Sequence, residues 1–372
     1  MQDFLNSTNF TQIFIALILI KFLLETYLKI RNLKSIDNNK DSVPPRFKDV
    51  VTEEEYKKSI LYNTDRIKFQ IFTALFGSVV LVIFTIGGLL NYLTQVVMDM
   101  TSSNVLGAVL LGLLLIIVEE IISIPISIYS TFVIEERHGF NKTTRKTFVT
   151  DIFKGLLISG AISSILYATV IFIIISAGDL WWIYAFAAVF TLQAIIFFLY
   201  PVLIMPLFNK FEPLDDEQFK KPIEKLLEKV DFKSKGLFVM NASLRSTHGN
   251  AFFTGFGKNK RIVFFDTLLK TINPDEMEAI LGHELGHYKL GHIRKTLISS
   301  LVFGFLGFYI LNEIFKSDNF FIAHGLENLT VYSKFLMFYL VIGSYTFFTK
   351  PITSALSRKR EFEADDFSFQ FT

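Results

Sequence analysis

The 372-residue sequence contains no cysteine. Disulfide bonds and thiolate ligands are therefore excluded, and any bound metal must be held by histidine and carboxylate side chains. The sequence has almost no excess of one charge sign either, since 37 Lys and Arg and 35 Asp and Glu give a net charge of +2. Such a balance does not indicate a nucleic-acid partner. The sequence also lacks internal repeats and low-complexity tracts.

Apolar residues are abundant instead. They make up 51% of the chain, with 42 Phe, and the mean hydropathy is +0.43, far above the range of soluble proteins. A bilayer-spanning helix needs about 20 apolar residues. Seven stretches come near this length and predict seven spans: Phe10–Leu28, Ile71–Val97, Val105–Phe132, Leu156–Ala177, Leu180–Leu207, Leu297–Phe315 and Phe335–Phe348. The first is not expected to be a cleaved signal peptide, since Asp3 and no basic residue precede it.

Basic residues alternate between the loops. They are plentiful after the first, third and seventh expected spans and absent from the loops after the second and fourth, with Lys316 as the one exception to the alternation. Basic loops stay in the cytosol. The pattern therefore predicts an outside N-terminus and a cytosolic segment at about residues 209–295.

That segment has the pattern of a small α+β domain. A helix is expected at Asp216–Val230, strands at 236–240, 251–256 and 261–265, and a turn at Gly257–Lys260. A second helix is expected from Pro274, with Asn273 as its N-cap and acidic residues in its first turn.

The second helix carries the most informative motif, His283-Glu284-Leu285-Gly286-His287. Residues four apart share one helical face, so His283 and His287 are spaced to bind one zinc ion, with Glu284 beside them as a proton acceptor. About 0.006 such matches are expected by chance in this length. The alternative is an ordinary surface helix with two solvated histidines.

A third protein ligand is needed. Glu361 is the better candidate, with Asp365 four residues on as the acceptor for the outer N–H of a ligand histidine. His292 lies off the ligand face and is interpreted as a supporting or solvated residue, and Glu363 is a weaker ligand candidate. A merely charged juxtamembrane helix is the alternative for this acidic cluster.

The HELGH motif with the downstream E-x-x-A-D resembles the type I CAAX prenyl proteases, which are integral-membrane zinc endopeptidases. Further similar segments are FVIEERHGFNK at 132–142, Pro201 with PLFNKF at 206–211, RSTHGNAFFTGF at 245–256 and RIVFFDTLL at 261–269. The similarity runs over residues 31–367. It implies a mostly α, multi-span fold in which seven transmembrane helices form a barrel-like chamber, capped by a small α+β gluzincin-type zinc domain.

Carried over by position, the resemblance makes His283, His287 and Glu361 the ligands of one Zn²⁺ per chain and Glu284 the general base. Asn250 and Ala251 match a strand that holds extended substrate, as an open strand edge can, and His248 matches a position near it. An ordinary core strand is the alternative for 251–256. Asp365 and His292 are expected to support the ligands.

The expected organisation has four parts: spans 1–5 with cytosolic loops at 1–208, the zinc domain at 209–296, spans 6–7 at 297–350, and the third-ligand helix at 351–372. Family members continue beyond that helix into a segment with a His and an Arg near the site. The sequence ends at Thr372, so we expect a truncated helix without that oxyanion donor, or a substitute such as His248.

The predicted function is zinc-dependent hydrolysis of peptides at the cytosolic face of a bacterial inner membrane or the endoplasmic reticulum, with removal of C-terminal residues from prenylated proteins or related peptides. Partners are the peptide and membrane lipid, and a monomer is compatible with the sequence. Alternatives are an HtpX-like quality-control protease, a site-two-type intramembrane protease, and a non-enzymatic scaffold or transporter with Glu119 and Glu120 on an ion path.

Overall fold

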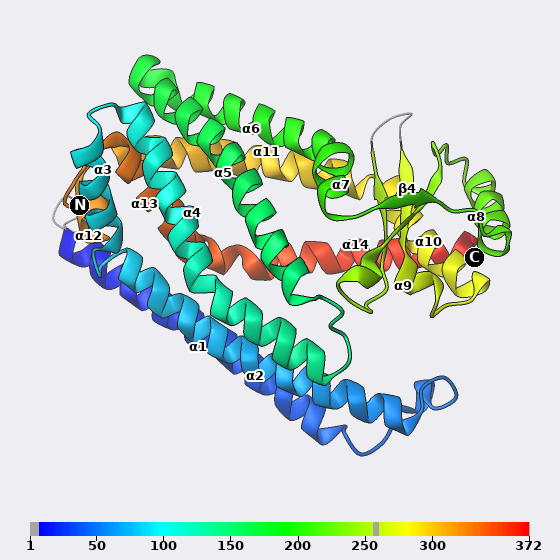
Figure 1. Ribbon diagram of the computed structural model, residues 1–372. Coiled ribbons are helices and arrows are strands. Elements are labelled where there is room, and N and C mark those ends of the chain that lie inside the picture. The colour runs from blue at the N-terminus through cyan, green and yellow to red at the C-terminus, as the bar shows by residue number, and fades with distance from the viewer. Residues whose placement is uncertain (1–6, 256–259, 372) are drawn as a thin grey trace. The chain divides into compact units, whose positions relative to one another are not determined.

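The structure is a computed structural model that describes residues 7–255 and 260–371. The chain divides into two compact units, each made of segments distant in sequence. Unit 1 comprises residues 1–139, 155–185 and 309–348, and unit 2 comprises residues 140–154, 186–308 and 349–372. Figure 1 shows that helices predominate, with one small sheet in unit 2.

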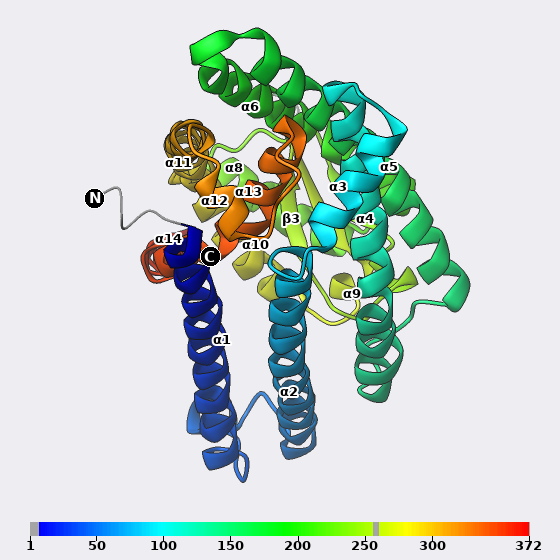
Figure 2. The same cartoon turned by 90° about the vertical axis from the view of Figure 1, so that its left-hand side faces the viewer.

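Unit 1 is helical in its described part. Its helices are α1 (Ser7–Asn38), α2 (Glu53–Phe84), α3 (Leu89–Met100), α4 (Asn104–Tyr129), most of α5 (Arg145–Ser176), α12 (Asn319–Ala323) and α13 (Val331–Thr346). Short turns add η2 (Pro45–Phe47), the π-helical η3 (Ser130–Glu135) and η4 (Gly178–Leu180). The helices α12 and α13, both orange, lie side by side in Figure 2.

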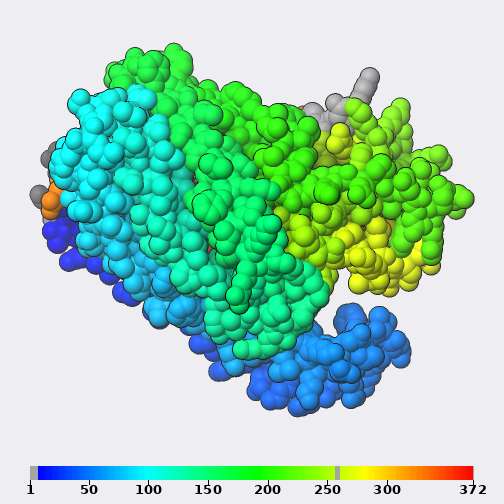
Figure 3. All heavy atoms as spheres, in the orientation of Figure 1, coloured from blue at the N-terminus to red at the C-terminus, as the bar shows by residue number. Residues whose placement is uncertain are grey.

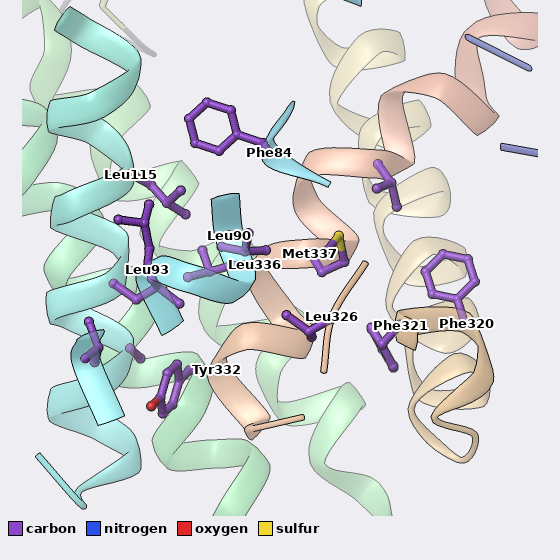
Figure 4. Packing of buried hydrophobic residues seen from close by; sticks show 14 of the residues in the cluster. Phe84, Leu90, Leu93, Leu115, Phe320, Phe321, Leu326, Tyr332, Leu336 and Met337 are labelled. Atoms are coloured by element: carbon purple, nitrogen blue, oxygen red, sulfur yellow. The ribbon is translucent and has the colours of Figure 1, made fainter. Parts of the chain in front are cut away.

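One apolar core joins these helices where they converge. Phe84 of α2, Leu90 of α3, Phe321 of α12 and Met337 of α13 are at most 2% exposed and belong to the same cluster, and Figure 4 shows their side chains gathered between the helices. Burial of large apolar side chains is the main favourable term in such packing. Segments near the start and the end of the chain are thereby held in one body.

Small residues allow two long helices to lie close together. A Cβ at Gly112 of α4 would stand only 2.1 Å from the ring of Tyr167 in α5, so any larger residue would have to displace that ring. Figure 3 shows α4 and α5 as neighbouring bands of cyan and green on the face in view. Small residues at such contacts are typical of packed membrane helices.

Six helical segments in the described residues are long and apolar enough to cross a membrane: Glu53–Phe84, Asn104–Glu135, Arg145–Ser176, Gly178–Phe208, His292–Phe315 and Val331–Phe371. The multi-span prediction is confirmed, but the count of seven is wrong. The expected first span, Phe10–Leu28, lies in α1 and is not among the six. Its apolar run contains two charged residues, Lys21 and Glu25.

Two expected boundaries also differ. The run Ile71–Val97 is not one helix, because α2 ends at Phe84 and α3 begins at Leu89. Gly88 between them takes φ +79°, a left-handed conformation that interrupts a helix. The short run Phe335–Phe348 belongs to a 41-residue helical segment, Val331–Phe371, so it is longer than its apolar part alone suggests.

Unit 2 contains a four-stranded sheet with β1 (Phe211–Pro213), β2 (Leu237–Met240), β3 (Ala251–Thr254) and β4 (Arg261–Phe265). The strand order is β1-β2-β4-β3, with β2 parallel to β4 and the other pairs antiparallel. The three predicted strands and both predicted helices are found. The short β1 was not predicted, and the expected turn at Gly257–Lys260 lies mainly outside the described residues.

Different elements pack on the two faces of the sheet. Phe264 and Ile262 of β4 point to a core with α8 (Glu217–Lys229) and α10 (Pro274–Lys289). Val263 points to the opposite face and packs near Met205, as the alternation of strand side chains requires. That face is reached from α6 (Trp181–Leu199) through the π-helical η5 (Tyr200–Ile204) and α7 (Met205–Phe208).

The remaining elements of the chain are η6 (Ala242–Leu244), α9 (Asp266–Leu269), α11 (His292–Phe315), η8 (Phe347–Thr349) and α14 (Lys350–Phe371). Among them α14 makes the most extensive contact with α10, and Figure 1 shows the two helices together. This pair brings distant parts of the sequence to one place.

A tight junction in unit 1 yields a stability prediction. Gly325 has φ +91°, and a Cβ there would lie 2.4 Å from the carbonyl oxygen of Thr85. We expect Gly325→Ala to lower the free energy of unfolding by at least about 1 kcal/mol, because both the conformation and the contact become strained. Thermal unfolding in detergent measures this. Gly343→Ala in α13 is the control, since its Cβ would meet nothing within 4 Å, and equal melting temperatures for both variants would refute the argument.

Candidate metal centre

The helix α10 begins where the sequence predicts. The Asn273 side chain accepts a hydrogen bond from the Glu276 amide at 2.9 Å, and the Glu276 carboxylate accepts one from the Asn273 amide at 2.9 Å. This reciprocal cap satisfies amides that no helical carbonyl reaches, and Pro274 fits the first helical position. The start of α10, and with it the register of the histidines, is thereby fixed.

One face of α10 is anchored in the core of unit 2. Met277, Leu281 and Leu285 are fully buried against the sheet and α8. His283 and His287 are only partly buried, one helical turn apart on another face. The spacing of the apolar residues therefore turns the histidines away from the core.

The helix α14 approaches α10 very closely at Gly286. A Cβ at this position would lie 2.9 Å from the Cα of Ala364, which is itself fully buried. Only glycine leaves room for the backbone of α14 here. The contact carries Glu361, one turn before Ala364, to the histidine pair.

Three possible ligand atoms converge at this point. The Nε2 atoms of His283 and His287 are 3.1 Å apart, and Glu361 Oε2 lies 3.4 Å from the first and 3.5 Å from the second. Zinc takes nitrogen and oxygen ligands at about 2.0–2.2 Å in a tetrahedron, which places such ligands about 3.3–3.6 Å apart. These three residues could hold a metal ion. Their donor atoms and spacing suit zinc.

Each histidine also has an outer partner. His283 Nδ1 lies 2.7 Å from Asp365 Oδ1, whereas His287 Nδ1 lies 3.0 Å from Nδ1 of the buried His292. His292 Nε2 in turn lies 3.0 Å from Glu363 Oε2. Such partners fix the ring orientation of a ligand histidine. Burial lowers the pKa of His287, which favours the neutral ring that binds a metal.

Glu284 lies beside this group and lines a surface cleft of about 490 Å³ together with His283, Asp365 and Phe369. Burial, followed by the nearby Glu361 carboxylate, raises the pKa of Glu284, although His283 acts in the opposite direction. A carboxylate of raised pKa beside a metal group is a stronger proton acceptor than an ordinary one.

The three predicted substrate residues lie on or before β3, which is an edge strand of the sheet. Ala251 is 5% exposed and pairs with Phe264 of β4, and the Asn250 carbonyl accepts a hydrogen bond from the Phe265 amide at 2.9 Å. The ring of His248 stacks on Phe140 at 4.4 Å. None of the three belongs to the group of possible metal ligands found among the described residues.

Two residues of the centre have contacts that the sequence alone does not predict. Glu363 lies outside the group of possible ligands and pairs with His292. Gly286 was treated only as part of a motif, yet it permits the approach of α14. A signal for Glu363 existed, because it lies two residues from both Glu361 and Asp365 in the same acidic cluster.

Comparison with known proteins agrees with this arrangement. Residues 32–210 match the family described as CAAX prenyl protease N-terminal, five membrane helices, and residues 213–372 match peptidase family M48. The CAAX prenyl protease 1 homolog of Arabidopsis thaliana is 34% identical over 96% of this chain and 86% of its own length. CAAX prenyl protease 1 of Saccharomyces cerevisiae is 34% identical over 94% of this chain and 82% of its own.

A solved structure is also similar. The crystal structure of S. mikatae Ste24p has a TM-score of 0.89 and 30% sequence identity, and the match covers 97% of this chain and 88% of that one. Similarity of this extent, in both sequence and fold, covers the membrane helices as well as the peptidase part. The chain therefore belongs to the CAAX prenyl protease 1 family, the membrane metalloendopeptidases of peptidase family M48.

Proposed function

We propose that His283, His287 and Glu361 bind one zinc ion per chain and that Glu284 is the general base for peptide hydrolysis. The observation that carries this proposal is the convergence of the three ligand atoms, with mutual distances of 3.1, 3.4 and 3.5 Å. Asp365 orients the ring of His283, and His292 orients that of His287.

The chain's own groups account for the proton transfers. Bound zinc supplies Lewis-acid polarisation of a carbonyl and lowers the pKa of water. Glu284 accepts the proton of the attacking water and then donates it to the departing amine, as a positioned carboxylate does in general acid–base catalysis. Its burial makes it a better proton acceptor.

We propose that the peptide binds in extended form along the free edge of β3, with Asn250, Ala251 and His248 near it. An edge strand offers unpaired backbone groups that a substrate pairs with, and β3 has that position in the strand order. The two relatives carry the name CAAX prenyl protease 1, so C-terminally prenylated peptides are the proposed substrate class.

The proposed site faces the cytosol, in the endoplasmic reticulum or a bacterial inner membrane. The loops near Arg137–Lys154 and Lys210–Lys289 are rich in basic residues, whereas no Lys or Arg lies in 85–104 or 177–180. This alternation holds for the six spans found as it does for the seven expected, and basic loops remain cytosolic.

The first prediction separates metal binding from chemistry. Glu284→Gln is expected to retain about one zinc per chain and to lose about 100-fold or more in kcat, because it keeps the ligands and removes the proton acceptor. Glu361→Ala is expected to lose both zinc and activity, since two histidines alone hold the ion weakly. Elemental analysis and peptide cleavage measure the two effects, and full activity of zinc-loaded Glu284→Gln would refute the assignment.

The second prediction concerns the close approach of α14. Gly286→Ala is expected to weaken zinc binding about 10-fold or more, because its Cβ pushes the Ala364 backbone, and with it Glu361, away from the histidines. Zinc competition against a chelator measures the change. Gly307→Ala is the control, since its Cβ would meet nothing within 4 Å. Equal zinc affinity in both variants would contradict the role of this contact.

The third prediction tests the substrate class. A farnesylated peptide ending in a CAAX sequence is expected to be cleaved with a higher kcat/KM than its unprenylated twin, because the apolar chain adds binding free energy. Glu284→Gln should cleave neither. Equal kcat/KM for the two peptides would leave the peptidase assignment intact and remove the prenyl preference.

A further inference from the structure

A second cavity lies in unit 2 on the sheet face that points away from α10. It has a volume of about 430 Å³. Val263 of β4 forms part of its floor, whereas the neighbouring Phe264 points into the core shared with α10. Strand side chains alternate between faces, so the sheet separates this cavity from the candidate metal centre.

The opposite wall is the end of a membrane span. Pro201, Val202, Met205 and Pro206 line the cavity, and they belong to the last turns of the span Gly178–Phe208. The π-helical η5 covers Tyr200–Ile204, and π-helical turns occur often at functional sites. A wall made from the end of a span places the cavity at the level of the membrane surface.

Several hydrogen bonds hold this wall in place. The Asn209 side-chain oxygen Oδ1 accepts a hydrogen bond from Arg245 at 3.0 Å, and the same guanidinium binds Asp151 through two nitrogens at 2.7 and 2.9 Å. The Lys210 amide donates to the Asn241 side chain at 2.7 Å, and Lys154 Nζ donates to the Leu207 carbonyl at 2.7 Å. The cavity is thus built on fixed backbone.

The cavity combines positive charge with apolar surface. Lys210 and Arg261 supply two cations against the single carboxylate of Glu212. The Arg261 guanidinium lies 5.2 Å from the ring centre of Phe238, which holds it over the cavity. In the described part of the chain no acidic side chain forms an ion pair with Lys210 or Arg261. Both charges are therefore available to an anion.

The side chains next to the cavity favour a lipid over a soluble anion. Val202 is 62% exposed and Leu203 59% exposed, and such apolar side chains at a span end contact acyl chains. Tyr200 is also exposed, as is typical of tyrosine at the membrane interface. Paired basic residues at this level attract anionic head groups.

We propose that this cavity binds one anionic phospholipid, with the phosphate held by Lys210 and Arg261 and the upper acyl chain lying along Pro201, Val202 and Met205. The lipid would join the end of the span to the sheet face that points away from α10. It is a binding site separate from the peptide and the metal, so its test does not depend on catalysis.

The experiment uses the full chain in detergent micelles, titrated with phosphatidylglycerol or with phosphatidylcholine of the same acyl chains, and native mass spectrometry counts bound lipid. We expect one phosphatidylglycerol per chain, bound about tenfold or more tightly than phosphatidylcholine. Lys210→Gln with Arg261→Gln should abolish that preference, because each basic residue near an anionic head group contributes roughly fivefold. The control is Lys225→Gln with Lys233→Gln, which removes the same two positive charges from residues that are exposed and lie outside the cavity.

Val202→Trp provides a second variant, which fills the cavity without changing charge and is expected to weaken binding of both lipids. Zinc content verifies that each variant is folded. Three results would overturn the proposal: an unchanged preference in the Lys210/Arg261 variant, equal binding of the two lipids by the wild type, or displacement of lipid by an equal concentration of glycerol 1-phosphate. If the Lys210/Arg261 variant kept its lipid preference but no longer bound an acidic peptide that the wild type binds, the cavity would be assigned to a peptide instead.

Discussion

The close approach of α10 and α14 is the contact on which the candidate metal centre depends. The backbone of α14 reaches α10 only because Gly286 has no Cβ, and this contact sets where Glu361, Asp365 and Glu363 lie. The core face of α10 fixes the other partner, since Met277, Leu281 and Leu285 are fully buried. A helix held on one side by the sheet and on the other by a second helix keeps its side chains in place, as a metal site requires.

The sheet of unit 2 serves both of its faces. Through Ile262 and Phe264 it supports the helix that carries the proposed zinc ligands, and through Val263 it forms the floor of the cavity at the end of a span. Its β3 edge is the place proposed for the substrate. The alternation of its side chains therefore lets one small sheet support α10 on one face and line the cavity on the other, while its edge is the one proposed for the peptide.

Much of this arrangement could be predicted from local sequence. The Asn273–Pro274 start, the strand at Arg261–Phe265 and the histidine spacing depend on neighbouring residues, and the structure contains each of them. The bounds of the second span could not be obtained as easily, because Gly88 divides the apolar run Ile71–Val97 between two helices. The pairing of Glu363 with His292 and the need for Gly286 depend on which helices meet, which one sequence does not specify. The metal roles themselves stay predictions.

The spacing of the centre along the chain has a consequence for biosynthesis. His283 and its partner Asp365 are 82 positions apart, and two membrane-crossing segments begin between them, at His292 and Val331. The histidines are therefore synthesised before Glu361, the third proposed ligand. The proposed three-residue group is therefore complete only after α14 has been synthesised, when all six candidate spans have left the ribosome or begun to do so.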